Sequence, residues 1–203
     1  MLSEEVTVPD VVTLSGSPVM PSRSQHLLCV AEEMLCERGY SVQRIDVRQL
    51  PAQALVYGDW NDPAVRAALE TVRAARAVIV ATPLYKASYS GALKTLLDLL
   101  PQTAFAHKPV LAFATGGSLA HLLALDYALK PVLVALGARL MLDNVFATEC
   151  DIHQTDGVYK LAGSLAQRLS SAVESLAQAL EDREALARLR ASTVLDQMSA
   201  VAQ

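Results

Sequence analysis

Short apolar segments rich in β-branched residues alternate with segments of helical pattern along most of this 203-residue chain. Such alternation is typical of an open parallel sheet whose crossover helices cover both faces. The run Ala77-Val-Ile-Val-Ala81 is continuously apolar, as expected for a strand buried on both faces. We predict strands at about 8–14, 41–47, 77–81, 110–114 and 139–146. We predict helices at about 24–38, 62–75, 91–100, 118–136 and 161–180, with a loop over 50–61.

The chain is unusually apolar, with 52% hydrophobic residues and a mean hydropathy of +0.29. A membrane-spanning helix needs about 20 consecutive apolar residues, and Gly, Pro, Asp or Lys interrupts the longest apolar stretches. The acidic start, residues 1–5, does not resemble a secretory signal. We therefore predict a cytoplasmic protein without a membrane span, whose apolar excess is buried in the sheet and between subunits.

The charge and the cysteine content argue against a nucleic-acid-binding, a disulfide-rich or a metal-binding protein. The formal net charge is -4 and there is no basic cluster, so the chain lacks the positive surface that nucleic-acid binding requires. Three cysteines, an odd number, do not form a disulfide framework, and their spacing matches no metal site. We predict neither a nucleic-acid partner nor a metal.

The last part of the chain differs in composition from the rest. From Glu181 onward the sequence is rich in charged residues, alanine and arginine, and then becomes polar. We predict one domain over 1–185 and a C-terminal extension over 186–203, either helical or disordered.

In open α/β sheets, ligands bind beyond the carboxyl ends of the strands. The first such loop, 14–24, brings four serines and Arg23 to the start of a predicted helix. Hydroxyl donors, a guanidinium and free helix amides together favour a phosphate. Gly16 stands alone there, without the three glycines of a dinucleotide fingerprint, which indicates a terminal monophosphate rather than a pyrophosphate.

Two further loops end at the same edge of the predicted sheet. Loop 82–91 contains a proline and two tyrosines that could form a shelf for a flat aromatic ring. Loop 115–118, Thr-Gly-Gly-Ser, lets the backbone approach a ligand closely because glycine has no Cβ. The three loops together indicate one flat, phosphorylated ligand.

Three segments carry a resemblance to a known family: Gly16-Ser-Pro with Ser22-Arg-Ser24, the long segment 81–101, and Ala114-Thr-Gly-Gly-Ser118 with 120–124 and 126–131. They resemble the NADPH-dependent FMN reductases of the flavodoxin-like superfamily. Among these, the sequence is most similar to the reductase component of two-component alkanesulfonate monooxygenase systems. The resemblance covers about 10–185 and is weakest over 139–154 and after Glu181.

The resemblance implies a flavodoxin-like three-layer sandwich, with a five-stranded parallel sheet of order 2-1-3-4-5 and helices on both faces. It also implies the cofactor-binding residues. The FMN phosphate would be held by Ser15, Ser17, Ser22, Arg23 and Ser24. The isoalloxazine ring and ribityl chain would be lined by Pro83, Leu84, Tyr85, Lys86, Ala87 and Ser90. The other side of the flavin would be approached by Thr115, Gly116, Gly117 and Ser118.

The implied activity is the reduction of FMN to FMNH2 by NADPH or NADH. No catalytic side chain is expected, because the flavin itself accepts the hydride. The reduced flavin would be supplied to an FMNH2-dependent sulfonate monooxygenase. Two alternatives remain: a quinone or azo reductase with bound FMN, and a flavodoxin-type electron carrier. A net charge of only -4 makes the carrier the weaker of these.

Tyr127 lies four residues before Pro131, which has no amide hydrogen to donate to the Tyr127 carbonyl. A kink or a π-bulge at Tyr127 would relieve this conflict. The sulfonate-linked members of the family similarly carry a tyrosine in a π-helix at a subunit interface near the flavin. We therefore expect Tyr127 to lie at an interface and to tune flavin retention, in a homo-oligomer that is a tetramer or a dimer.

Overall fold

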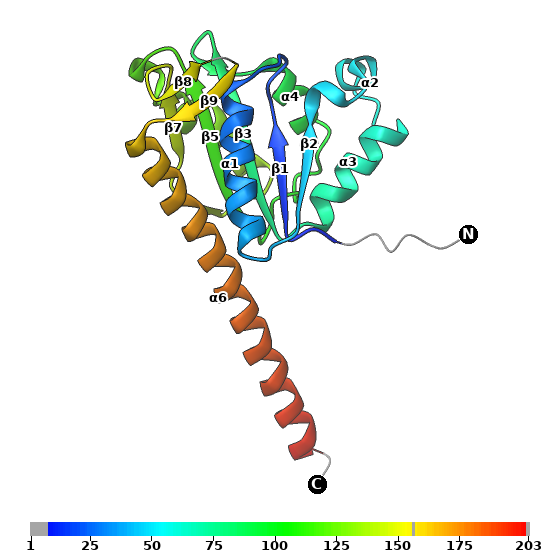
Figure 1. Cartoon of the computed structure of the whole chain (residues 1–203). Helices are drawn as coiled ribbons and strands as arrows, with labels where there is room; N and C mark the ends of the chain where they lie inside the picture. The colour runs from blue at the N-terminus through cyan, green and yellow to red at the C-terminus, as the bar shows by residue number, and fades with distance from the viewer. Residues whose placement is uncertain (1–7, 156, 202–203) are drawn as a thin grey trace, which may run out of the picture.

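A computed structural model describes residues 8–155 and 157–201 of the chain, and only the backbone over 193–201. Part of the predicted domain 1–185 (residues 1–7 and 156) and the end of the predicted extension 186–203 (residues 202–203) lie outside the described residues. Figure 1 shows a central sheet between two layers of helices, with one long helix, α6 (Gly163–Val201), running past the body of the molecule.

The central sheet has a parallel core in the order β2-β1-β3-β5-β6. These strands are β1 (Val11–Ser15), β2 (Val42–Asp46), β3 (Ala77–Tyr85), β5 (Pro109–Gly116) and β6 (Leu140–Met141). The predicted flavodoxin-like order of five parallel strands is thereby confirmed. Val11, Leu14 and the segment 77–81 are fully buried, which accounts for part of the high hydropathy.

The sheet has seven strands rather than the five predicted. The predicted strand 139–146 is split into β6 and β7 (Val145–Thr148), both of which pair with β5. The break contains Asp143-Asn144, two residues that favour turns over strands. The seventh strand, β4 (Ser88–Tyr89), pairs antiparallel with the end of β3.

Two apolar clusters hold the helices to the sheet. On one face, α1 (Arg23–Glu37) and α6 pack against the sheet through residues such as Leu27 and Leu169. On the other face, α3 (Pro63–Ala74), α4 (Gly91–Leu97) and α5 (Lys130–Ala135) bury residues such as Leu93 and Leu133. The fold is therefore the three-layer sandwich that the alternating sequence predicts.

One predicted loop and one predicted helix need correction. The predicted loop 50–61 contains a short helix, α2 (Ala52–Tyr57), which follows the 3₁₀ turn η1 (Val47–Gln49). Six residues are too few for a clear helical period, so the sequence pattern does not reveal it. Helix α4 ends three residues earlier than the predicted 91–100, at Leu97.

The segment predicted as one helix over 118–136 is instead divided into three pieces. A 3₁₀ turn η2 (Leu119–His121) precedes a π-helix η3 (Leu125–Leu129), which leads into α5. The Lys130 amide donates to the Leu125 carbonyl, five residues earlier, as in a π-helix. The π-bulge predicted from Pro131 is confirmed, and Tyr127 within it is strongly exposed.

A hairpin follows β7 that the sequence pattern did not predict. Strands β8 (Ile152–Thr155) and β9 (Val158–Leu161) pair antiparallel in a separate two-stranded sheet. Figure 1 places this hairpin at the same end of the molecule as the carboxyl ends of the parallel strands. Within the described part of the chain, none of the helices combines the length and apolarity needed to cross a membrane.

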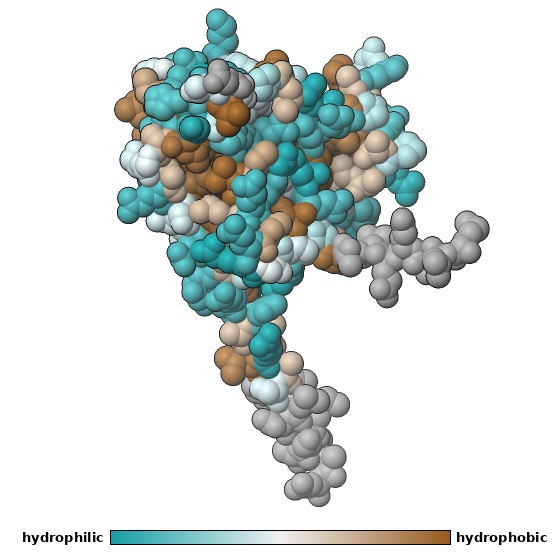
Figure 2. All heavy atoms as spheres, in the orientation of Figure 1, coloured by the Kyte–Doolittle hydropathy of each residue, from teal (hydrophilic) through white to brown (hydrophobic). Residues whose placement is uncertain are grey.

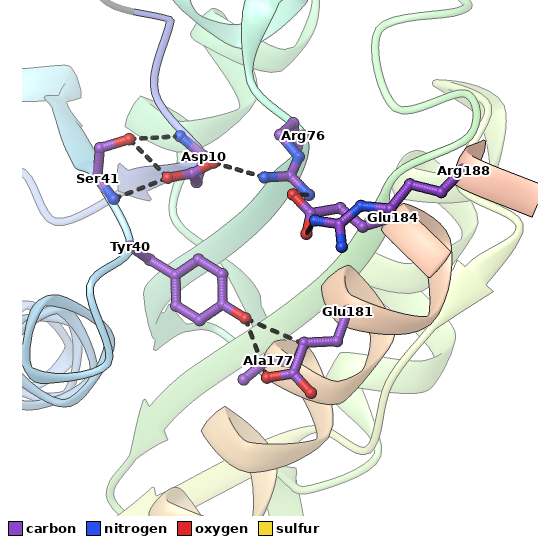
Figure 3. Close-up of polar contacts among 8 residues, drawn as sticks. All are labelled: Asp10, Tyr40, Ser41, Arg76, Ala177, Glu181, Glu184 and Arg188. Carbon is purple, nitrogen blue, oxygen red and sulfur yellow. Dashed lines mark hydrogen bonds and ion pairs between the residues drawn. The ribbon is translucent and has the colours of Figure 1, made fainter. Parts of the chain in front are cut away.

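A polar network ties α6 to the opposite, amino end of the sheet (Figure 3). Asp10 accepts bonds from the Ser41 amide and hydroxyl, at 2.9 and 2.8 Å, and from the Arg76 guanidinium at 2.7 Å. Arg76 also pairs with Glu184 of α6 at 2.9 Å. The Tyr40 hydroxyl donates to the Ala177 carbonyl of α6 at 3.4 Å. This network fixes the direction in which α6 leaves the body.

Replacing Asp10 with asparagine should lower the free energy of unfolding by about 1–3 kcal/mol at neutral pH, because charged hydrogen bonds are lost. Burial pushes the pKa of Asp10 upward, but the bonds from Ser41 and Arg76 outweigh it, so the pKa lies below the usual 3.8. The stabilisation by the Asp10 carboxylate is therefore complete at pH values above its pKa in the unfolded chain. It is lost as the pH falls through the lower pKa that Asp10 has in the folded protein.

Urea unfolding of wild type and Asp10→Asn across a pH series measures this difference, which should shrink as the solution becomes acidic. Asp59→Asn is the matched control, because the exposed Asp59 carboxylate accepts only a local bond from the Asn61 amide among the contacts the structure describes. A difference that stays constant down to low pH would contradict the assignment.

Candidate functional site

A pocket opens at the carboxyl ends of the parallel strands. Its wall comes from the loop after β1 with the start of α1, from the carboxyl ends of β3 and β5 with Gly117, and from Glu149 and Tyr159 in the segment that runs from β7 into β9. The lining residues are Ser17, Val19, Pro21, Ser22, Arg23, Pro83, Leu84, Tyr85, Thr115, Gly116, Gly117, Glu149 and Tyr159. Three loops that the sequence predicts to share one ligand thus meet in one cavity.

The first loop is fixed at its base by bonds to neighbouring elements. The Gly16 amide donates to the Ala81 carbonyl at 2.8 Å, and the Ser90 hydroxyl donates to the Gly16 carbonyl. A Cβ added to Gly16 would lie 2.8 Å from the Leu93 Cβ, so only glycine fits this position without movement. The loop therefore leaves β1 in contact with both β3 and α4.

The start of α1 presents hydrogen-bond donors and a positive charge to the pocket. Ser22 is the N-cap, and its hydroxyl accepts from the Gln25 amide at 3.4 Å and lies 3.0 Å from the Ser24 hydroxyl. The first amides of a helix have no partner within the helix, and they favour an anion. Arg23 borders the pocket directly beside them. This donor set fits a phosphate group.

The second loop forms a tight hairpin between β3 and β4. Lys86 and Ala87, at its tip, have positive φ values of 51° and 61° although neither is glycine. Both central residues of a two-residue hairpin turn adopt this left-handed conformation when the turn follows the twist of the strands. The turn places the exposed Tyr85 side chain at the edge of the pocket, where it can support a flat ring.

Nine of the fifteen predicted cofactor-binding residues line the pocket: Ser17, Ser22, Arg23, Pro83, Leu84, Tyr85, Thr115, Gly116 and Gly117. The other six are placed around it. Ser15, Ser24 and Ser90 are buried behind the lining, and Ser90 caps α4 by accepting from the Leu93 amide at 3.1 Å. Lys86, Ala87 and Ser118 are exposed in turns. For all fifteen, direct contact with a flavin stays a prediction.

Sequence reasoning missed four lining residues: Val19, Pro21, Glu149 and Tyr159. Glu149 follows β7, within the stretch 139–154 where the family resemblance is weak, and Tyr159 lies on β9, just beyond that stretch. Tyr159 packs against His26 of α1, with ring centroids 5.5 Å apart. Burial lowers the pKa of His26, partly opposed by Glu33. No sequence motif indicated that the hairpin would wall the pocket.

Comparisons with known proteins agree with this geometry. The sequence profile described as NADPH-dependent FMN reductase matches residues 9–152. An FMN reductase (NADPH) of Pseudomonas putida is 46% identical over 175 residues, covering 85% of this chain and 89% of that protein. The apo structure of the NADH:FMN oxidoreductase EMOB superimposes with a TM-score of 0.75 at 37% identity, covering 83% and 88% of the two chains.

A Streptococcus pneumoniae flavodoxin also superimposes, with a TM-score of 0.54 at 17% identity, over 83% of this chain and 96% of that protein. At this identity the likeness concerns the fold alone. It agrees with the parallel α/β sandwich.

Proposed function

Because this chain belongs to the NADPH-dependent FMN reductase family, we propose that it reduces FMN in the pocket at the start of α1 and releases FMNH2 to a sulfonate monooxygenase. NAD(P)H-dependent reduction of FMN follows from the family. The coupling to desulfonation of organosulfonates rests on the resemblance of segments such as 81–101 to sulfonate-linked reductases. A cytoplasmic location belongs to the same proposal.

The convergence of Arg23 and the Ser17 and Ser22 hydroxyls at a helix start is the observation that carries the proposal. These groups would hold the FMN phosphate, with the hairpin at Tyr85 supporting the ring. On the opposite wall, a Cβ added to Gly117 would meet no described atom within 4 Å, so the backbone there borders open space. That side leaves room for the nicotinamide ring of the coenzyme beside the flavin.

When bound, FMN would supply the redox chemistry, because a flavin can accept a hydride from a nicotinamide coenzyme. The protein's own part is to bind the phosphate, orient the ring and leave one face accessible. None of these tasks requires a side chain that exchanges protons with the substrate. We therefore expect ring-lining substitutions such as Tyr85→Phe to change affinity more than turnover.

Coenzyme oxidation, measured with and without added FMN, tests the activity. Dependence on added FMN, with little flavin retained during purification, supports a reductase that releases its product. Tightly held flavin with quinone-dependent turnover would favour a quinone or azo reductase, and no coenzyme oxidation would favour an electron carrier. The partner is tested by adding a sulfonate monooxygenase and measuring sulfite, which should appear only when reductase, FMN and oxygen are all present.

We also propose that the chain assembles as a tetramer or a dimer through the segment around η3. This segment exposes four large apolar or aromatic side chains, those of Leu119, Leu122, Leu123 and Tyr127. Exposed apolar patches of this kind often mark protein–protein interfaces. Figure 2 shows that the face seen there carries its apolar side chains in groups among polar ones. The π-helix packs against β4 of the pocket hairpin, which would link assembly to flavin binding.

Replacing Tyr127 with alanine should shift the protein toward smaller assemblies and change the amount of flavin retained. Light scattering during size-exclusion chromatography and the flavin absorbance of the eluted protein measure the two effects. Tyr57→Ala is the matched control, because Tyr57 is 77% exposed and Tyr127 is 78% exposed, on different elements. If the two variants behave alike, Tyr127 has no special role in assembly.

A further inference from the structure

Glu149 places a negative charge beside the residue that would bind the phosphate. Its Oε1 atom lies 3.5 Å from Nη1 of Arg23, and both residues line the pocket. Among the lining residues that the structure describes, Arg23 carries the one side chain with a full positive charge at neutral pH. A carboxylate at this position neutralises the cation on which phosphate binding depends.

The position of Glu149 is set by a closed turn. The Asp151 carboxylate accepts from the Thr148 amide and from the Thr148 hydroxyl, each at 2.7 Å, and these bonds lower the pKa of Asp151. Nε of Arg23 donates to the Ile152 carbonyl at 3.4 Å, which attaches the segment after the turn to α1. Glu149 is therefore held next to the start of α1 by its own segment.

The Arg23–Glu149 pair is one that a phosphate can displace. The Glu149 side chain is 65% exposed and that of Arg23 is 34% exposed, so water screens their attraction. A phosphate monoester carries nearly two negative charges at neutral pH and offers several acceptor oxygens. It would therefore compete successfully for the guanidinium, while the displaced carboxylate remains close and repels it.

We propose that Glu149 competes with the FMN phosphate for Arg23 and thereby weakens flavin binding enough for reduced flavin to leave. This inference rests on the proposed function, since it assumes that the phosphate binds at Arg23. Glu149 would therefore lower the affinity for flavins that carry a phosphate and leave the affinity for the flavin ring itself unchanged. A residue that merely oriented Arg23 for the phosphate would have the opposite effect when neutralised.

The test is the dissociation constant of oxidised flavin, measured by fluorescence titration for wild type and Glu149→Gln. Glu149→Gln should bind FMN about fivefold more tightly, given the size of a Coulomb interaction at this distance near water. Riboflavin, which has the same ring but no phosphate, should bind both proteins equally. The gain for FMN should shrink at high salt, because it is electrostatic.

Two further variants separate charge from shape. Glu149→Asp keeps the charge and should stay close to wild type in its affinity for FMN. Glu174→Gln removes a comparable carboxylate of α6, which is 72% exposed and paired with Arg38 at the end of α1 away from the pocket, and it should not change flavin binding. Circular dichroism confirms that each variant is folded before the titrations are compared.

Unchanged or weaker FMN binding by Glu149→Gln overturns the inference, and so does an equal gain for riboflavin. Either result, with wild-type protein that binds and reduces FMN, leaves the proposed function intact. A wild-type protein that binds riboflavin and FMN equally would instead contradict the phosphate site itself.

Discussion

Arg23→Ala should weaken FMN binding by about 10- to 100-fold, which is the largest effect we expect from a single side chain at the pocket. A hydrogen bond to a charged group contributes about 1.5–3 kcal/mol, and about 1.4 kcal/mol corresponds to tenfold in affinity. Removal of the guanidinium also leaves the Glu149 carboxylate unopposed beside the phosphate. Riboflavin binding should be nearly unaffected.

Fluorescence titration with the two flavins measures this effect, and steady-state kinetics should show a raised KM for FMN with kcat largely retained. Arg38→Ala is a close control, since Arg38 caps the opposite end of α1, away from the pocket, and its side chain is nearly equally exposed, at 35% against 34% for Arg23. Arg23→Lys should fall between wild type and Arg23→Ala, because lysine keeps the charge but not the planar fork of donors. If Arg23→Ala binds FMN as tightly as wild type, the phosphate assignment is wrong.

Gly16→Ala should destabilise the protein and weaken flavin binding together. The added Cβ would lie 2.8 Å from the Leu93 Cβ and 3.1 Å from the Ala81 carbonyl oxygen, neither of which is the end of a flexible side chain. Either the first loop or α4 has to move, and overpacking of this kind costs about 1–3 kcal/mol of unfolding free energy. A displaced loop also carries Ser17 away from its place in the pocket.

Urea unfolding and FMN titration measure the two consequences of Gly16→Ala. Gly91→Ala provides the comparison, because a Cβ at Gly91 would meet no described atom within 4 Å and its φ is not positive. Equal stabilities of the two variants would show that the contact between the first loop and α4 is loose.

The sequence predicted most of the parallel sheet and the meeting of three loops at its edge, because both follow from local pattern and strand direction. Gly16, Arg23 and the Thr115-Gly-Gly117 stretch could be found in this way. The π-helix at Tyr127 was also predictable, since a proline four residues later removes one identifiable hydrogen bond.

The parts that were missed depend on contacts between distant segments. Glu149 and Tyr159 reach the pocket only because the β8–β9 hairpin packs against α1, and nothing in the sequence near either residue signals that packing. Six predicted residues lie outside the pocket lining for a related reason: the sequence does not show which way a side chain near the pocket points. Whether a hydroxyl such as that of Ser90 faces a pocket or caps a helix is decided by the neighbouring elements.

The interrupted outer edge of the sheet has a consequence for solubility. A long, flat edge strand is a template on which the strand of another chain can add, and this is a common start of aggregation. Here the outer edge beside β5 consists of β6, with two residues, and β7, with four, separated by the bend at 142–144. β6 and β7 are both short and are not continuous with each other, so they offer few unpaired backbone groups in one line to which another strand could bind. At this edge of the sheet, a flavin-free chain of such high hydropathy is thus less open to the addition of a strand from another chain.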